Sequence, residues 1–196
     1  ATQLRLLNDY PHYVFLQSSP QAYEWLEEDA PDLFKQIRQA IADGRWIADG
    51  ATWVEMDCNI TSGESLVRQL FYGKRYFRDK LGVESAVLFL PDVFGYSAAL
   101  PQLLKLAGVR GFVTSKISWN QYNEFPFDSF VWRGIDGSEI VTQYINSPID
   151  LMVKWFRTYN ARPDATCLHR TWQAYKHKDL KLEPFFTFGF GDGGGG

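Results

Sequence analysis

The residues best suited to chemistry lie in the stretch 88–97, which reads Leu-Phe-Leu-Pro-Asp-Val-Phe-Gly-Tyr-Ser. The apolar run 86–90 ends at Pro-Asp, and a helical pattern opens at Ala98. This order predicts a strand buried on both faces, a tight turn and a helix start. Sites of α/β folds lie at the carboxyl ends of such strands, so Asp92 is the first candidate. Its carboxylate could be a nucleophile, a metal ligand or merely a capping acid.

A second acid has the same setting near the end of the sequence. Residues 184–190 have the pattern of a strand, and Gly191-Asp192 follows, with glycines that let the backbone approach a ligand. Two acids at the tips of two parallel strands would form a pair. With aromatic residues around it, such a pair suggests glycoside hydrolysis, in which one acid attacks or activates water and the other protonates the leaving oxygen. Asp pairs also hold metals, so the residues alone leave both readings open.

A third informative stretch is the segment 53–65. If it is extended, alternation places four residues on one face: Trp53, Glu55, Asp57 and Asn59. Glu64 has a structural explanation, because it forms a capping box with Thr61 and an i,i+4 pair with Arg68. Asp57 has no such simple explanation and stays a candidate for the site.

The elements that must position these residues alternate between helices and strands, which predicts an α/β fold with parallel pairing. Around Asp92, strand 86–90, helix 98–107 and strand 110–115 form a βαβ unit. Segments 130–132 and 139–142 flank an Asp136-Gly137 turn, as in a hairpin. The remaining predictions are a helix over 1–9, a strand over 12–16, helices beginning at Pro20 and Pro31, a strand over 45–48, a long helix ending at Gly82, a helix beginning at Pro163-Asp164 and a last strand over 184–190.

Composition excludes several classes of function. The net charge of −3 offers no basic footprint, so we expect no nucleic-acid partner. No run reaches the roughly 18 apolar residues of a membrane span, and no signal core opens the sequence. The two cysteines, Cys58 and Cys167, show no disulfide pattern, which favours a reducing compartment. These features predict a cytoplasmic enzyme without membrane contact.

Both ends of the sequence read as interruptions of a larger domain. The sequence closes on Gly-Asp-Gly-Gly-Gly-Gly directly after a strand pattern, and no start signal precedes Ala1. We therefore interpret residues 1–196 as a partial catalytic domain, truncated at both ends.

Four groups of residues carry a resemblance to a known family. They are Trp53-Val54-Glu55-Met56-Asp57-x-Asn59-x-x-Ser62-Gly63-Glu64-Ser65-x-Val67-Arg68-Gln69, then Leu90-Pro91-Asp92-Val93-Phe94-Gly95-Tyr96-Ser97-x-x-Leu100-Pro101-Gln102, then Asp136-Gly137-Ser138, and Gly189-x-Gly191-Asp192 with the glycines after it. In this order, over nearly the whole sequence, they resemble the α-mannosidases of glycoside hydrolase family 38, especially the cytosolic and bacterial branch. The Pro-Asp-x-Phe-Gly-Tyr-Ser segment is the most specific element.

The resemblance implies part of a seven-stranded (β/α) barrel, of the glycoside hydrolase and deacetylase type. It also implies retaining hydrolysis of α-mannosides in mannose-containing oligosaccharides, assisted by one zinc ion. Asp92 matches the nucleophile, which also ligates the zinc, and Asp192 is the best match to the general acid. Trp53 and Asp57 match a segment that lines the sugar pocket. In a retaining enzyme the two carboxyl groups lie roughly 5–5.5 Å apart.

The sequence departs from the family pattern at the zinc site. The family uses a His-x-Asp pair from an early strand and a later His, whereas His12, His169 and His177 lie in other contexts. We expect the missing ligands before Ala1 and after Gly196, so that the isolated chain binds zinc poorly, is inactive and associates with other copies or with the rest of the catalytic chain. Two alternatives stay open: a metal-dependent deacetylase with a related barrel, and a non-catalytic sugar-binding piece.

Overall fold

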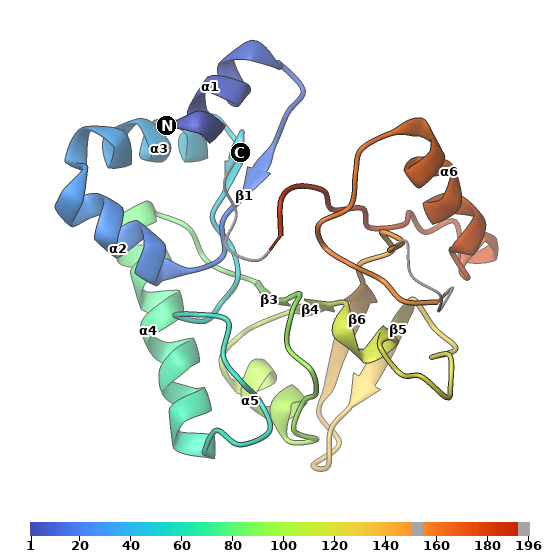
Figure 1. Cartoon of the computed structure of the whole chain (residues 1–196). Helices are drawn as coiled ribbons and strands as arrows, with labels where there is room; N and C mark the ends of the chain where they lie inside the picture. The colour runs from blue at the N-terminus through green and yellow to red at the C-terminus, as the bar shows by residue number, and fades with distance from the viewer. Residues whose placement is uncertain (150–154, 192–196) are drawn as a thin grey trace.

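The computed structural model describes residues 1–149 and 155–191 and shows an α/β fold. In Figure 1, helices α1 to α4 gather on one side of the main sheet and α6 lies at its other end. The helices are α1 Thr2–Asp9, α2 Pro20–Asp29, α3 Pro31–Ala42, α4 Gly63–Leu81, α5 Leu100–Leu106 and α6 Ala165–Ala174. The predicted helices are thus confirmed. None of the described helices is long and apolar enough to cross a membrane.

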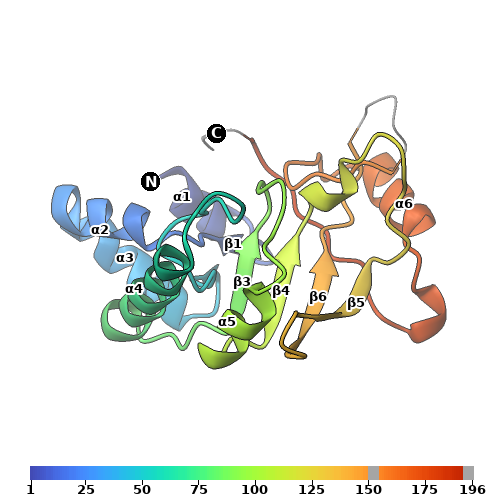
Figure 2. The same ribbon diagram turned by 90° about the horizontal axis from the view of Figure 1, so that it is seen from below.

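The main sheet has four strands in the order β3-β4-β6-β5, seen side by side in Figure 2. The strands are β3 Val87–Leu90, β4 Gly111–Thr114, β5 Ser129–Arg133 and β6 Glu139–Tyr144. Strands β3, β4 and β6 are parallel, and β5 is antiparallel to β6. The predicted hairpin is therefore confirmed, with Gly137 at φ +86° in its turn. A separate two-stranded parallel sheet pairs β1 Phe15–Leu16 with β2 Trp46–Ile47.

The βαβ unit predicted around Asp92 is formed by β3, α5 and β4. Its core contains Leu88, Leu90, Leu100 and Leu104, which are fully buried. Each such side chain stabilises the fold by about 1.5–3 kcal/mol relative to an exposed one. The unit thus provides the rigid support from which Asp92 projects.

A second hydrophobic cluster lies among α1, α2, α3 and α4. Both α2 and α3 begin at a proline, which suits the first helical turn because proline has no N–H to leave unsatisfied. The guanidinium of Arg45 donates to the backbone carbonyls of Leu7, Tyr10 and Tyr13. These bonds connect the end of α1 and the turn after it to the start of β2. These bonds hold residues 10–13 in a turn, and the strand predicted over 12–16 is consequently only two residues long. His12 lies exposed in that turn rather than in a strand.

The long helix α4 joins the two clusters. It begins one residue later than predicted, because the side chain of Ser62, not of Thr61, accepts the N–H of Ser65. It ends as predicted at Gly82, at φ +70°. A Cβ at Gly73 would come within 2.4 Å of the backbone carbon of Thr52, so this glycine allows α4 to lie directly against the segment that leads into residues 53–59.

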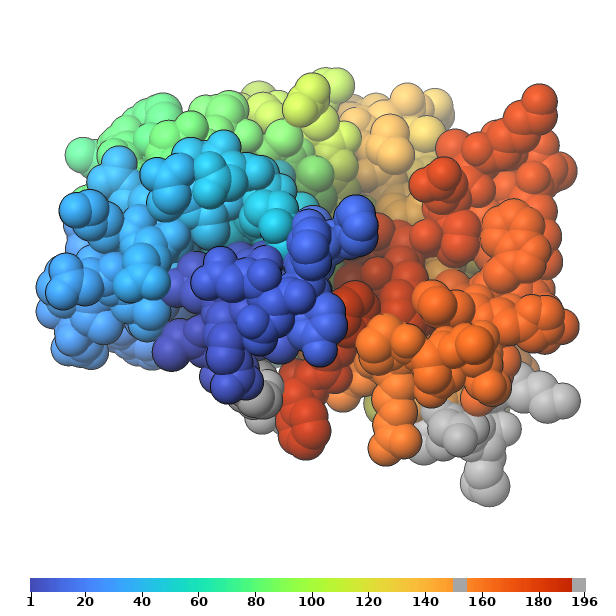
Figure 3. Space-filling view, turned by 90° about the horizontal axis from the view of Figure 1, so that it is seen from above, coloured from blue at the N-terminus to red at the C-terminus, as the bar shows by residue number. Residues whose placement is uncertain are grey.

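The last predicted strand, over 184–190, is wrong as a continuous strand. Only isolated bridges occur there, Ile145 with Phe185 and Ala161 with Phe188. Side chains replace backbone partners, because the N–H groups of Phe185 and Thr187 donate to Asn146 Oδ1 and Ser147 Oγ. In Figure 3 the red segment at the end of the described chain lies between the blue N-terminal region and the orange region near residue 160. The ring contact between Tyr13 and Phe188, at 6.2 Å, agrees with that position.

The described strands form two separate sheets, of two and four strands. A closed seven-stranded barrel is not seen among the described residues. What the structure supports is the coarser expectation of an α/β fold with a parallel core, and the barrel stays a prediction.

Candidate active site at the carboxyl end of β3

Asp92 lies just beyond the carboxyl end of β3, as predicted. The parallel register pairs Leu90 with Thr114, so Asp92 and Lys116 each follow the last paired residue of their strand by two positions. This register brings the two side chains together: Lys116 Nζ lies 3.0 Å from Asp92 Oδ1. Lys116 starts the short 3-10 helix η1, Lys116–Ser118, that follows β4.

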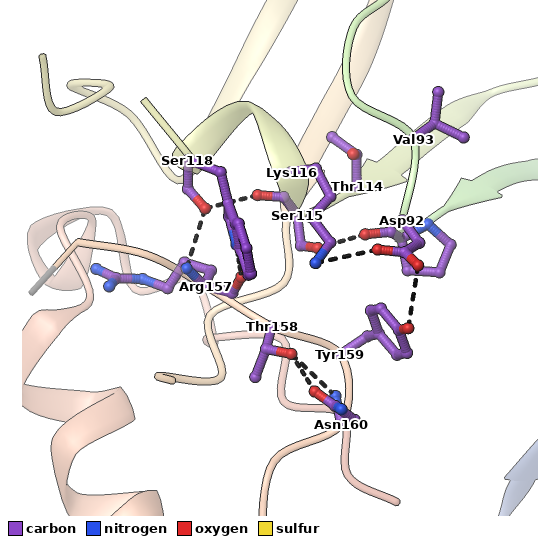
Figure 4. Close-up of polar contacts among 12 residues, drawn as sticks. Asp92, Val93, Thr114, Ser115, Lys116, Ser118, Arg157, Thr158, Tyr159 and Asn160 are labelled. Atoms are coloured by element: carbon purple, nitrogen blue, oxygen red, sulfur yellow. Dashed lines mark hydrogen bonds and ion pairs between the residues drawn. The ribbon is translucent and has the colours of Figure 1, made fainter. Parts of the chain in front are cut away.

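The other carboxylate oxygen also has a partner. Tyr159 donates its hydroxyl to Asp92 Oδ2 at 3.2 Å, and Figure 4 shows Asp92 between the ends of the Lys116 and Tyr159 side chains. The ammonium of Lys116 lies 3.7 Å from the ring centre of Trp119 and 5.3 Å from that of Phe94. These aromatic rings add a favourable cation–π environment for the ammonium. The Asp92 side chain is 36% exposed and the Lys116 side chain only 8%, so solvent reaches the carboxylate but hardly the ammonium.

The backbone around Asp92 is fixed from two directions. Ser115 donates its hydroxyl to the carbonyl of Pro91. On the other side, the N–H of Asp92 donates to the carboxylate of Glu55. Pro91 has no N–H, and its ring restricts the turn further. The position of the Asp92 side chain therefore depends on residues from three separate parts of the chain.

Glu55 has an unusual electrostatic environment for a glutamate. Its pKa is raised to about 7, chiefly by partial desolvation of the carboxyl group and in part by the negative charge of Asp92, although the residue as a whole is exposed. The N–H of Asp92 and the charge of Lys116 act in the opposite direction. Glu55 and Asp92 thus form a pair of close carboxylates beside a single buried ammonium, a combination typical of functional sites.

The turn after Asp92 is held against the segment 55–59. Cys58 and Tyr96 form an isolated parallel bridge. Gly95, at φ +149°, lies against Asn59: a Cβ there would come within 2.7 Å of Asn59 Nδ2. The Tyr96 hydroxyl bonds the carbonyl of Val93 at 2.9 Å and the hydroxyl of Thr114, and burial raises its pKa above the ordinary value.

The expectation that Trp53, Glu55, Asp57 and Asn59 share one face is wrong. The segment bends instead of forming a strand. Trp53 donates its Nε1–H to Gln21 at 3.0 Å and packs edge-on against Tyr76 in the helical cluster. Asp57 is exposed and accepts the N–H groups of Asn59 and Ile60, both at 2.8 Å, which lowers its pKa. The structure thus gives both predicted binding residues partners within the fold, and their binding roles stay predictions.

Asp192, the predicted general acid, lies outside the described residues. Of the histidines, His177 accepts the N–H of Asp128 at 3.2 Å, while His12 and His169 are exposed. Among the described residues, no group of three His, Cys, Asp or Glu side chains could hold a metal ion. Both oxygens of Asp92 face protein donors, Lys116 and Tyr159. The described residues therefore do not fit a complete zinc site.

No role at the site was predicted from the sequence for three of its residues. Lys116 had a signal that could have found it, because it follows the neighbouring parallel strand at the position equivalent to Asp92. Glu55 was noticed only as part of an alternating pattern. Tyr159 had no such signal, because it lies 67 positions from Asp92, in the stretch 155–161, which forms neither a helix nor a strand.

The arrangement can support nucleophilic chemistry at Asp92. The carboxylate is partly open, its charge is matched by an ammonium, and a hydroxyl fixes its second oxygen. Phe94, 65% exposed, offers an aromatic surface next to it. Residues 1–196 match the domain described as "Glycosyl hydrolases family 38 N-terminal domain". The chain belongs to glycosyl hydrolase family 38.

Family 38 relatives match along the full chain. Alpha-mannosidase G of Dictyostelium discoideum is 42% identical over 196 residues, and an alpha-mannosidase of Saccharomyces cerevisiae is 40% identical over 197 residues. In both cases the match covers 100% of this chain and 17% of the relative, so the chain spans about a sixth of the length of these enzymes.

A solved alpha-mannosidase has a similar fold. The alpha-mannosidase from Enterococcus faecalis V583 superposes with a TM-score of 0.64, at 18% identity, over 93% of this chain and 20% of that one. At this identity the likeness concerns the fold alone.

Proposed function

We propose that this chain supplies the nucleophile of a retaining α-mannosidase, and that the nucleophile is Asp92. The observation that carries the proposal is the environment of this carboxylate: it lies at a parallel strand end, partly open, between Lys116 and Tyr159. Membership in family 38 and the alpha-mannosidases named among its relatives support a mannose-containing glycan as the substrate.

The reaction would proceed in two displacements. An oxygen of Asp92 attacks the anomeric carbon, the bond from that carbon to the leaving oxygen breaks, and a general acid gives the leaving oxygen its proton. Water, deprotonated by the same acid residue, then attacks the anomeric carbon and releases Asp92 from the glycosyl ester. Lys116 and Tyr159 would hold the carboxylate in line with the sugar and balance its charge before the attack.

The partner acid stays a proposal from the sequence. Asp192 is our candidate, and the expected separation of roughly 5–5.5 Å from Asp92 applies to the complete site. Zinc, which the resemblance implies, needs ligands beyond the residues that the structure describes. The inactivity of the isolated chain, its self-association and a cytoplasmic location are likewise predictions.

The test is made on the protein that carries this chain, with an aryl α-mannoside as the substrate. We expect turnover to fall by about 10³-fold or more in Asp92→Ala, since removal of a nucleophile leaves only binding and residual electrostatic catalysis. An activated fluorinated mannosyl fluoride should trap a glycosyl ester on Asp92, detected by mass spectrometry of the peptide. Zinc content measured in parallel reports whether the variant still binds the implied metal.

Two results would overturn the proposal. Turnover by Asp92→Ala at the wild-type rate would remove Asp92 from the chemistry. A glycosyl ester trapped on a different residue would move the nucleophile elsewhere. A deacetylase of related fold would use Asp92 as a base or a metal ligand, so a trapped ester on Asp92 also excludes that alternative.

A further inference from the structure

The backbone N–H of Asp92 has a long-range partner whose role is not explained by the fold. It donates to Glu55, 37 positions earlier in the chain. Strand β3 has already ended, so this bond is not part of a sheet ladder. A neutral acceptor could satisfy the same N–H, yet the chain places a carboxylate beside the carboxylate of Asp92. Ionising both groups so close together costs free energy, which points to a use at the site rather than in the core.

Glu55 is itself held in place from both ends of its segment. Before it, Val54 donates its N–H to the side chain of Gln69 on α4 at 3.0 Å. After it, Cys58 bridges to Tyr96 in the turn that follows Asp92. The close packing of Gly73 against Thr52 fixes the start of the segment. Glu55 thus reaches Asp92 from a fixed backbone, as a positioning group requires.

The bond defines the orientation of Asp92 together with a bond from the other side. Ser115 holds the carbonyl of Pro91, and Glu55 holds the N–H of Asp92. Both groups belong to the single peptide unit between Pro91 and Asp92, so the two bonds fix the plane of that unit and limit the rotation that would swing the Asp92 side chain away from Lys116. Misplacement of a reacting group by about 1 Å can cost on the order of 100-fold in rate.

We propose that Glu55 is a positioning residue of the active site, acting as the hydrogen-bond acceptor that fixes the backbone of Asp92. This inference rests on the proposed function, in which Asp92 is the nucleophile. Glu55 need not touch the sugar. Its contribution is to the rate of attack and not to the affinity for substrate.

The experiment compares three substitutions in the protein that carries this chain. Glu55→Gln keeps an acceptor oxygen at the same reach, whereas Glu55→Ala removes it. Glu64→Gln is the matched control, since Glu64 is an exposed glutamate on α4 that pairs with Arg68 at 2.8 Å. For each, kcat and KM are measured with an aryl α-mannoside, and the rate of labelling of Asp92 by the fluorinated mannosyl fluoride is followed by mass spectrometry.

We expect Glu55→Ala to lower kcat and the labelling rate by about 10- to 100-fold with KM changed less than about threefold. Glu55→Gln should retain most of the wild-type rate, and Glu64→Gln all of it. Equal losses in Glu55→Ala and Glu55→Gln would show that acceptance of the N–H is not the role. Wild-type rates in Glu55→Ala, or a loss confined to KM, would also overturn the inference.

A loss of activity in a variant counts against or for the role of Glu55 only if that variant still folds. Thermal unfolding of each variant is measured first, and if Glu55→Ala does not fold, Glu55→Met replaces it as a variant of similar length without a strong acceptor. Asp92→Ala, run in parallel, separates the two proposals: an active Asp92→Ala overturns the proposed function, whereas an inactive Asp92→Ala with an unaffected Glu55→Ala overturns only the role of Glu55.

Discussion

Asp57 and Asp92 lie in two turns that the Cys58–Tyr96 bridge holds side by side, and their carboxylates have different kinds of partner. Asp57 accepts the N–H groups of Asn59 and Ile60, two and three residues further along. Asp92 contacts Lys116 and Tyr159, which are distant in the sequence. The partners of Asp57 thus come from its own turn, whereas those of Asp92 are brought to it by the tertiary structure.

The same contrast separates Glu55 from Asp57 within one short segment. Local N–H donors lower the pKa of Asp57, because they stabilise the ionised form. Partial desolvation beside Asp92 raises the pKa of Glu55 to about 7, because it disfavours the ionised form. Two acids in the same segment thus differ because one faces its own backbone and the other faces the site. The direction of a carboxylate, more than its place in a motif, decides what it can do.

The largest expected effect comes from removing the cation that distinguishes the Asp92 turn. Lys116→Met keeps most of the side-chain volume but leaves Asp92 without its charged partner. We expect kcat to fall by about 100-fold, in the range found when a preorganised electrostatic group is removed. Turnover of an aryl α-mannoside by the protein carrying this chain measures it. Lys74→Met is the control, because Lys74 forms an ion pair with Glu84 on α4's side of the fold. Wild-type turnover in Lys116→Met would show that the Lys116–Asp92 ion pair does not contribute to catalysis.

A smaller effect is expected from disturbing the contact between the two turns. Gly95→Ala adds a Cβ within 2.7 Å of Asn59 Nδ2 at φ +149°, so we expect a loss of about 1–3 kcal/mol in the free energy of unfolding, measured with denaturant, together with lower turnover. Gly108→Ala is the control: Gly108 has φ +71° and open space around it, so only backbone strain is added there. Adding Asn59→Ala to Gly95→Ala should recover part of the loss. If the double variant recovers none of the lost unfolding free energy, the contact between Gly95 and Asn59 is not the cause of the loss.

The smallest effect is expected at Asp57. Its pKa is lowered in the folded protein, so its stabilisation is present above the ordinary pKa of 3.8 and is lost as the pH falls through the lowered value. Asp57→Ala should therefore have a slightly lower Tm than wild type at pH 7, and the difference should narrow below pH 3.8. Thermal unfolding across this pH range measures it. A constant difference at all pH values would contradict the turn role, and an unchanged KM would remove Asp57 from the predicted sugar pocket.

Local sequence signals predicted the elements well. The apolar run before Pro91 gives β3, the prolines at 20 and 31 begin α2 and α3, and Gly82 ends α4. These signals succeed because caps, turns and buried strands depend on neighbours within a few residues. They fail where side chains take over backbone partners, as Asn146 and Ser147 do for residues 185 and 187.

The sequence by itself determined the βαβ unit, the hairpin and the position of Asp92 at a strand end, because apolar periodicity and turn chemistry are local. Only the tertiary structure decided which groups surround that acid. The parallel register of β3 and β4 places Lys116 beside Asp92, and the packing of α4 on Thr52 fixes the start of the segment that contains Glu55. Tyr159 comes from the stretch 155–161, which forms neither a helix nor a strand. Such partners are many residues apart, and no local pattern encodes a distance between them.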